Sequence, residues 1–179
     1  MIVVTATRFE AFAARRELRS ARLARVGVGK GLRSEETLVS CGLAGGLRDD
    51  LATGTVLVPR EVQRPSGERV ACDPELVERL AAASRTLGLE PRSEPLVTRT
   101  TLVRGAERAR WAQCGFAGVD METGSLVAPR LAAVRVVLDT PKRELDWRAL
   151  WVPAEAWRCA RLAARVIAIA FPPPELDDA

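Results

Sequence analysis

Apolar and polar positions repeat with two different periods along the chain. Short runs rich in Val, Ile and Leu predict β-strands, and they occupy residues 2–4, 23–28, 37–41, 55–62, 117–121 and 134–138. Apolar residues at helical spacing, or residue types typical of helix ends, predict helices at residues 9–18, 32–36, 74–87, 107–113, 124–131 and 153–171. Strands and helices therefore alternate, and we predict the α/β class: a single-domain three-layer α/β/α sandwich with a mixed central sheet.

Residue types mark the ends of two helices. Asp73 is a good N-cap residue, Pro74 suits the first helical position, and Gly88 follows the last one. Consecutive prolines that begin at Pro172 stop the final helix. No linker divides the chain, so we predict one domain at residues 1–171 and a Pro-rich acidic tail at residues 172–179.

A glycine-rich segment follows the strand predicted at 37–41. Gly42, Gly45 and Gly46 accept positive φ angles and carry no side chain that would block approach. We therefore predict a tight turn whose backbone N–H and C=O groups come close to a small ligand. The alternative is a structural loop between two strands.

The composition excludes several classes of protein. The 179 residues, 47% of them apolar, suffice for one core without disulfides. No apolar run approaches the ~20 residues of a membrane span, and the N-terminus lacks a signal-type sequence, so we expect a cytoplasmic protein. The chain has no histidine and no closely spaced cysteine pair, so we expect no metal site. The cysteines, expected to be buried thiols, are Cys41, Cys72, Cys114 and Cys159.

The charge distribution argues against a nucleic-acid partner. The net charge of +4 comes from arginines scattered through the chain, and aromatic residues make up only 4%. Nucleic-acid-binding proteins more often carry a basic block with aromatic residues interleaved.

Three segments occur in a characteristic order: residues 41–47 (CGLAGGL), 119–122 (VDME) and 135–139 (RVVLD). Together they resemble the purine nucleoside phosphorylase and nucleosidase superfamily, nearest to its methylthioadenosine/S-adenosylhomocysteine nucleosidase branch. Residues 98–103 are also similar to the hopanoid-associated subgroup, and residues 146–150 to futalosine hydrolases. The resemblance covers residues 1–171 and implies a nucleoside phosphorylase-like fold.

The resemblance assigns two residues to catalysis. Asp139 matches the aspartate that protonates the leaving purine in the nucleosidases, and Glu10 matches the glutamate that directs or deprotonates the attacking water. An aspartate at the end of a buried strand can also hold a proton because it is partly desolvated. Two structural alternatives stay open, namely that Asp139 caps the turn at Thr140-Pro141 and that Glu10 is a solvated residue of the first helical turn.

The resemblance also implies the substrate contacts. Glu122 binds the ribose hydroxyls and Met121 packs against the sugar, although Glu122 could instead interact with the N-terminus of a following helix. The remaining contacts expected along the sugar and the base come from Ala44, Gly45, Gly46, Val103 and Arg135.

These assignments predict a nucleosidase that hydrolyses the N-glycosidic bond of a purine or 5′-modified purine nucleoside, with no cofactor and, as the family implies, a homo-oligomer, most simply a dimer. Phosphorolysis is the first alternative. Thr37 stands where the phosphorylase branch has an arginine, and Arg8 is the candidate to replace that arginine. A non-catalytic nucleoside-binding relative is the second. It stays open because Leu43, Leu138 and Leu102 depart from the family pattern.

Overall fold

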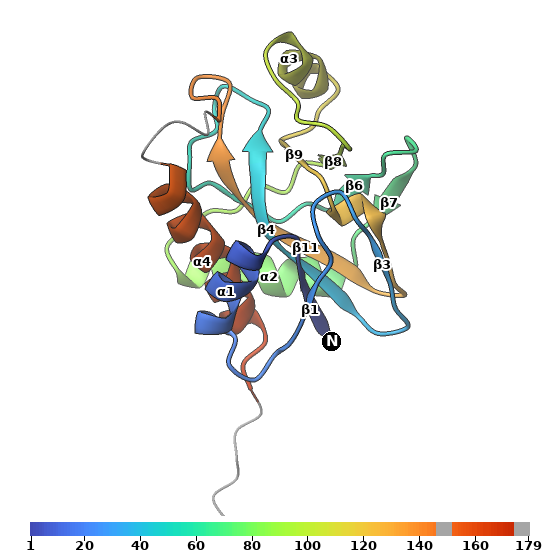
Figure 1. Cartoon of the computed structure of the whole chain (residues 1–179), viewed down its shortest axis with the longest axis vertical. Helices are drawn as coiled ribbons and strands as arrows, with labels where there is room; N and C mark the ends of the chain where they lie inside the picture. The colour runs from blue at the N-terminus through green and yellow to red at the C-terminus, as the bar shows by residue number, and fades with distance from the viewer. Residues whose placement is uncertain (146–151, 174–179) are drawn as a thin grey trace, which may run out of the picture.

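A mixed sheet forms the frame of the molecule (Figure 1). The structure, a computed structural model, describes residues 1–145 and 152–173. Within them the sheet has nine strands: β1 (Ile2–Thr5), β2 (Arg22–Arg25), β4 (Leu38–Gly46), β5 (Val56–Leu57), β6 (Glu61–Gln63), β7 (Arg69–Ala71), β8 (Leu96–Thr98), β9 (Gly118–Asp120) and β11 (Leu131–Asp139). A second, two-stranded sheet joins β3 (Leu32–Arg33) to β10 (Leu126–Val127).

Strand β4 is the centre of the sheet. It pairs in parallel with β11 from Leu38 to Gly45. Its other edge pairs with β1 near its start and, antiparallel, with β9 at Gly45 and Gly46. Asp139 at the end of β11 therefore lies beside Gly45, and the chain leaving β9 runs back along β4.

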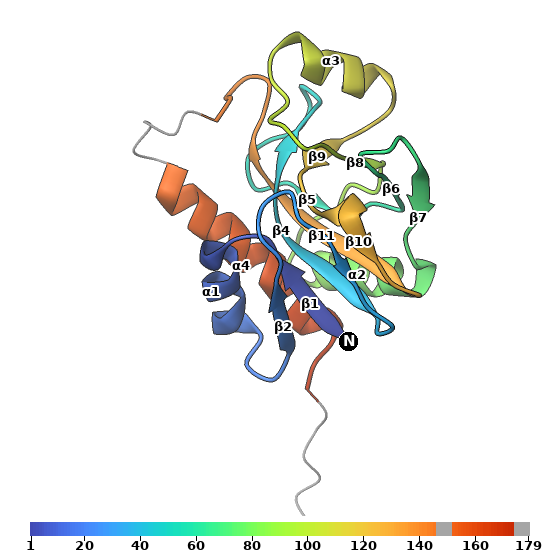
Figure 2. The same cartoon turned by 45° about the vertical axis from the view of Figure 1, so that its right-hand side comes forward.

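Helices pack against this sheet. The described helices are α1 (Arg8–Glu17), α2 (Pro74–Thr86), α3 (Ala106–Gln113), α4 (Val152–Ala170) and the 3-10 turn η1 (Thr123–Ser125). Helix α4 packs on β4 and β11 and also contacts α1 and α2, whereas α3 lies beyond the C-terminal end of β4, next to the start of β9 (Figure 2). The predicted α/β fold, a mixed central sheet flanked by helices, is confirmed. No helix in residues 1–145 or 152–173 is long and apolar enough to cross a bilayer.

The predicted start of α2 is confirmed in atomic detail. The Asp73 carboxylate accepts a hydrogen bond from the Leu76 amide at 3.0 Å, and Pro74 occupies the first turn. Arg130 contacts the same carboxylate at 2.7 and 3.0 Å.

Three local predictions were wrong. Residues 32–36 contain β3 rather than a helix. Residues 124–131 contain η1 and β10 rather than a helix, because Pro129 interrupts any helix and Leu126 is buried where it pairs with β3. The strand predicted at 55–62 is divided into β5 and β6 around Pro59, which has no N–H to donate.

One burial prediction also needs correction. Cys114 is exposed after the end of α3, whereas the other cysteines are buried. Phe9 and Phe12 are 38% and 55% exposed and contact Trp157, and α1 instead buries Glu10, Ala13 and Ala14. The predicted tail lies, from residue 174 onward, outside the described residues, as do residues 146–150.

Candidate active site

A cavity of about 480 Å³ opens where β4, β9 and β11 meet α3 and the starts of α1 and α4. This volume is within the range of small-molecule sites. Most predicted site residues line it: Glu10, Ala44, Gly45, Val103, Met121, Glu122 and Asp139. Gly46 and Arg135 do not line it and lie directly behind residues that do.

The predicted glycine-rich turn is a strand. Gly42, Gly45 and Gly46 belong to β4, and none of them has a positive φ angle. Glycine is required there for space, because a Cβ at Gly42 would overlap both Glu10 Oε1 and Arg135 Nη1. A Cβ at Gly45 would lie 3.2 Å from Asp139 Oδ1.

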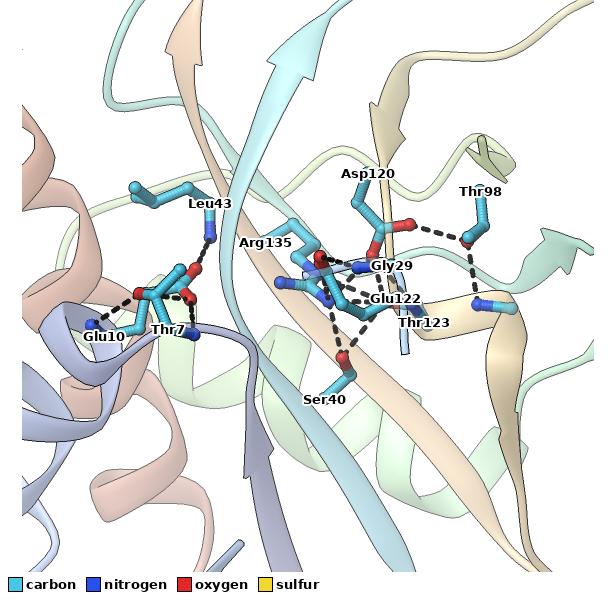
Figure 3. A network of polar contacts seen from close by, with 11 residues as sticks. Thr7, Glu10, Gly29, Ser40, Leu43, Thr98, Asp120, Glu122, Thr123 and Arg135 are labelled. Atoms are coloured by element: carbon cyan, nitrogen blue, oxygen red, sulfur yellow. Dashed lines mark hydrogen bonds and ion pairs between the residues drawn. The ribbon is translucent and has the colours of Figure 1, made fainter. Parts of the chain in front are cut away.

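Glu10 is held rigidly at the start of α1 (Figure 3). Its Oε2 accepts hydrogen bonds from the Thr7 amide and hydroxyl, both at 2.9 Å, in a capping box. Its Oε1 accepts a hydrogen bond from the Leu43 amide at 3.0 Å, which ties α1 to β4. Since only 6% of Glu10 is exposed, it is not a solvated residue of the first helical turn.

Arg135 lies in a buried polar network behind the cavity (Figure 3). Its Nη2 is 2.8 Å from Asp120 Oδ2 and 3.7 Å from Glu122 Oε2. It also donates to the Ser40 hydroxyl at 2.7 Å and to the Thr123 hydroxyl at 2.8 Å. Burial works against the charge, but the neighbouring carboxylates raise the pKa of Arg135 above its usual value. Among the described residues, its Nη1 has no hydrogen-bond partner.

Glu122 is buried and reaches the cavity between two partners. Its Oε1 accepts a hydrogen bond from the Gly29 amide at 3.2 Å, and its Oε2 faces Arg135. Burial raises the pKa of Glu122 above its usual value, although Arg135 acts in the opposite direction. Glu122 occupies the N-cap position of η1, but its side chain makes no capping hydrogen bond there.

Asp139 forms an ion pair with Arg108, a residue that the sequence analysis missed. Arg108 Nη2 donates to Asp139 Oδ2, and both side chains are buried. The Leu145 amide donates to the same oxygen at 3.1 Å. The carboxylate therefore bonds α3 and a following loop residue, rather than capping the turn at Thr140-Pro141.

One sequence signal could have identified Arg108. It lies three and four residues before Trp111 and Ala112, which pack against a small core cluster around Val103 and Phe116. Residues at this spacing share one face of a helix. Arg108 therefore lies on the inner face of α3, whereas Arg110, an arginine of the same helix, is exposed.

Solved structures with the same fold include nucleosidases and a futalosine hydrolase. A futalosine hydrolase mutant of Helicobacter pylori superposes with a TM-score of 0.77 at 12% identity, over 94% of this chain and 96% of that one. The 5′-methylthioadenosine/S-adenosyl homocysteine nucleosidase of Campylobacter jejuni gives the same values. The corresponding Neisseria meningitidis enzyme, in complex with methylthio-immucillin-A, gives 0.75 at 17% identity, over 94% and 96%.

Comparisons of sequence alone find less similarity than the comparison of structures does. No curated protein sequence matches the chain. The sequence profile of the phosphorylase superfamily matches residues 32–146, which include β4, β9, β11 and every site residue except Glu10. The chain belongs to the phosphorylase superfamily.

Proposed function

We propose that the protein is a nucleosidase that hydrolyses the N-glycosidic bond of a purine or 5′-modified purine nucleoside. The observation that carries the proposal is the convergence of Glu10, Glu122 and Asp139 on one cavity from three different elements. Glu10 lies beside Gly42 and Asp139 beside Gly45. Three residues of extended strand span about 10 Å, which suits a sugar at one end and a base at the other.

The proposed reaction needs one proton acceptor and one proton donor. Glu10 takes a proton from water as the water oxygen bonds to C1′ of the sugar. The bond from C1′ to the base breaks, its electron pair leaves with the base, and Asp139 supplies the proton that neutralises the base. The products are the free sugar and the free base, and solvent restores both carboxyl groups.

The remaining contacts divide the cavity between sugar and base. Glu122 accepts hydrogen bonds from the ribose hydroxyls, and Met121 packs against the ring. Val103 and Ala44 supply backbone and apolar contacts to the base, and both line the cavity.

Hydrolysis is favoured over phosphorolysis because few cationic side chains of the described residues are placed to bind phosphate in the cavity. A phosphate co-substrate needs cations that face the cavity. Of the described cavity residues, the cationic ones are Arg104 and Arg108, and Arg108 already pairs with Asp139 at the base end. Arg8 is exposed and does not line the cavity.

Release of free base tests the proposal. The protein is incubated with methylthioadenosine, S-adenosylhomocysteine, futalosine, adenosine and inosine, each with and without phosphate, and the base is measured by chromatography. A mock preparation, purified in the same way from cells that do not express the protein, reports contaminating activity. Base release without phosphate supports hydrolysis, release only with phosphate identifies a phosphorylase, and saturable binding without release identifies a non-catalytic binder.

A homodimer is a further part of the proposal. The exposed rings of Phe9 and Phe12, packed on Trp157 beside the cavity, support it. Sedimentation of the wild type and of a Phe12→Ser variant tests it, since a dimer formed through this surface should dissociate in the variant.

A further inference from the structure

Arg108 is a buried cation in a helix that is otherwise largely exposed. Only 4% of Arg108 is accessible, whereas Arg110 on the same helix is exposed. Removing a guanidinium from water costs several kcal/mol unless its donors are satisfied. The partners of Arg108 therefore indicate why it lies at the cavity.

Each nitrogen of the guanidinium group bonds a different segment. Nε donates to the Val103 carbonyl at 3.1 Å, in the loop before α3. Nη1 donates to the Gly46 carbonyl at 2.8 Å, at the end of β4. Nη2 donates to Asp139 Oδ2, at the end of β11. One side chain thus joins three walls at the base end of the cavity.

These contacts leave the two oxygens of Asp139 in different situations. Oδ2 accepts from both Arg108 and the Leu145 amide. Oδ1 accepts no hydrogen bond from residues 1–145 or 152–173, and it is the oxygen next to Gly45 on the cavity wall. A base bound in the cavity therefore meets Oδ1.

We propose that Arg108 is a positioning residue that acts through Asp139. The inference rests on the proposed nucleosidase function. When Asp139 carries a proton, its Oδ2 accepts from the guanidinium as a carbonyl oxygen, so the proton lies on Oδ1. That proton moves to a ring nitrogen of the base as the electron pair of the breaking C1′–N bond goes to the base, and the resulting carboxylate pairs with the guanidinium. By holding the carbonyls of Val103 and Gly46, the same group keeps the base in line with that oxygen.

The geometry requires a guanidinium rather than a positive charge alone. Arg presents its donors in a fixed planar fork, whereas Lys presents one compact ammonium group at the end of a flexible stem. An ammonium group cannot reach the three separated acceptors in the arrangement that Arg108 uses. We therefore expect Arg108→Lys to be impaired although it keeps the charge.

A double-mutant cycle tests the inference. Arg108→Gln, Arg108→Lys, Asp139→Asn and the two corresponding double variants are assayed for base release from the best nucleoside substrate, and Arg110→Gln is the matched surface control. Thermal unfolding confirms that each variant is folded. Should Arg108→Gln fail to fold, Arg108→Lys carries the same cycle.

The expected result is strong non-additivity. In the wild-type background, loss of Arg108 should lower kcat about 10- to 100-fold, since a misplacement of about 1 Å costs on that order. In the Asp139→Asn background, the group that Arg108 positions is already lost, so loss of Arg108 should lower kcat less than about twofold, which is within the usual scatter of additive effects. Arg110→Gln should leave kcat unchanged.

Two results would overturn it. An equal loss in both backgrounds would show a general structural role, and no loss in the wild-type background would show no role at all. Either result with an active wild type would refute the inference alone. A wild type that releases no base from any substrate would instead refute the proposed function on which it rests.

Discussion

Two buried arginines lie at opposite ends of the cavity, and they differ in how many of their nitrogens have a hydrogen-bond acceptor. Arg135, at the Glu122 end, does not line the cavity, and its Nη1 has no partner among the described residues. Arg108, at the Asp139 end, lines the cavity, and each of its nitrogens has an acceptor.

This difference separates the chemistry of the two ends. Arg135 Nη1 and Glu10 Oε1 both approach Gly42, so the end proposed for the sugar has a spare buried donor next to a carboxylate. At the base end the donors are occupied, and Asp139 Oδ1 is left to meet the ligand. In the proposed reaction, the first end activates water and the second exchanges one proton.

The largest expected effect comes from breaking the base end at Asp139. Asparagine keeps the shape and can still accept a hydrogen bond from Arg108, but it has no proton to supply. Asp139→Asn should therefore lower kcat for purine nucleosides by about 10²- to 10⁴-fold, the usual range for a general acid. Steady-state base release measures the loss. Asp49→Asn, an exposed aspartate beyond β4, is the control, and nearly intact activity of Asp139→Asn would refute its assignment as the acid.

The contrast between the two arginines also explains what the sequence could predict. Arg135 interrupts an otherwise apolar strand, where a charge needs a reason, and it lies in a segment that resembles a family motif. Arg108 lies in an arginine-rich helical segment outside those motifs, and its partners are two backbone carbonyls, Glu144 and a side chain 31 positions away. Sequence periodicity carries no information about such long-range contacts.

The same contrast holds for the fold: features with a local sequence signal were predicted, and features set by long-range contacts were not. The first part of β4 and most of β11 follow from apolar runs, and the ends of the helices α2 and α4 follow from a cap residue and prolines. Residues 41–47 were misread, because a glycine needed for close approach in a strand has the same sequence signal as a glycine needed for a turn. Only the proximity of Glu10 and Arg135 to Gly42 distinguishes the two.

A smaller effect is expected from breaking the sugar end at Glu122. Glutamine keeps the size of the side chain but removes the charged acceptor proposed for the ribose hydroxyls. Hydrogen bonds to charged groups contribute about 1.5–3 kcal/mol, so Glu122→Gln should lower kcat/KM about 10- to 100-fold. Comparing ribonucleoside with 2′-deoxynucleoside sharpens the test, because the variant should discriminate between them less than the wild type does. Unchanged discrimination would contradict the assignment.

The pH dependence of activity separates Glu122 from the other carboxylates. Burial raises the pKa of Glu122, so this group becomes protonated at a higher pH than an exposed glutamate does. If the ionised form binds ribose, kcat/KM should fall as the pH is lowered, beginning above the usual glutamate range. The acid limb of the wild-type profile should move to lower pH in Glu122→Gln. Identical acid limbs in the two proteins would exclude Glu122 as the group responsible.

The smallest effect is expected at an arginine–carboxylate pair outside the cavity. Asp73 caps α2 and pairs with the partly exposed Arg130. Arg130, followed by the Leu76 amide, lowers the pKa of Asp73 to about 2. A depressed pKa of an acid stabilises the fold at pH values above the unfolded-state pKa, and this stabilisation is lost as the pH falls towards the folded value.

Asp73→Ala should therefore lower the free energy of unfolding at pH 7 by about 1 kcal/mol, mainly through the lost cap, with unchanged kcat. Urea denaturation should give a smaller difference between the two proteins at pH 2.5 than at pH 7. A loss of activity in Asp73→Ala would show that the Asp73–Arg130 pair contributes to the site, contrary to its placement outside the cavity.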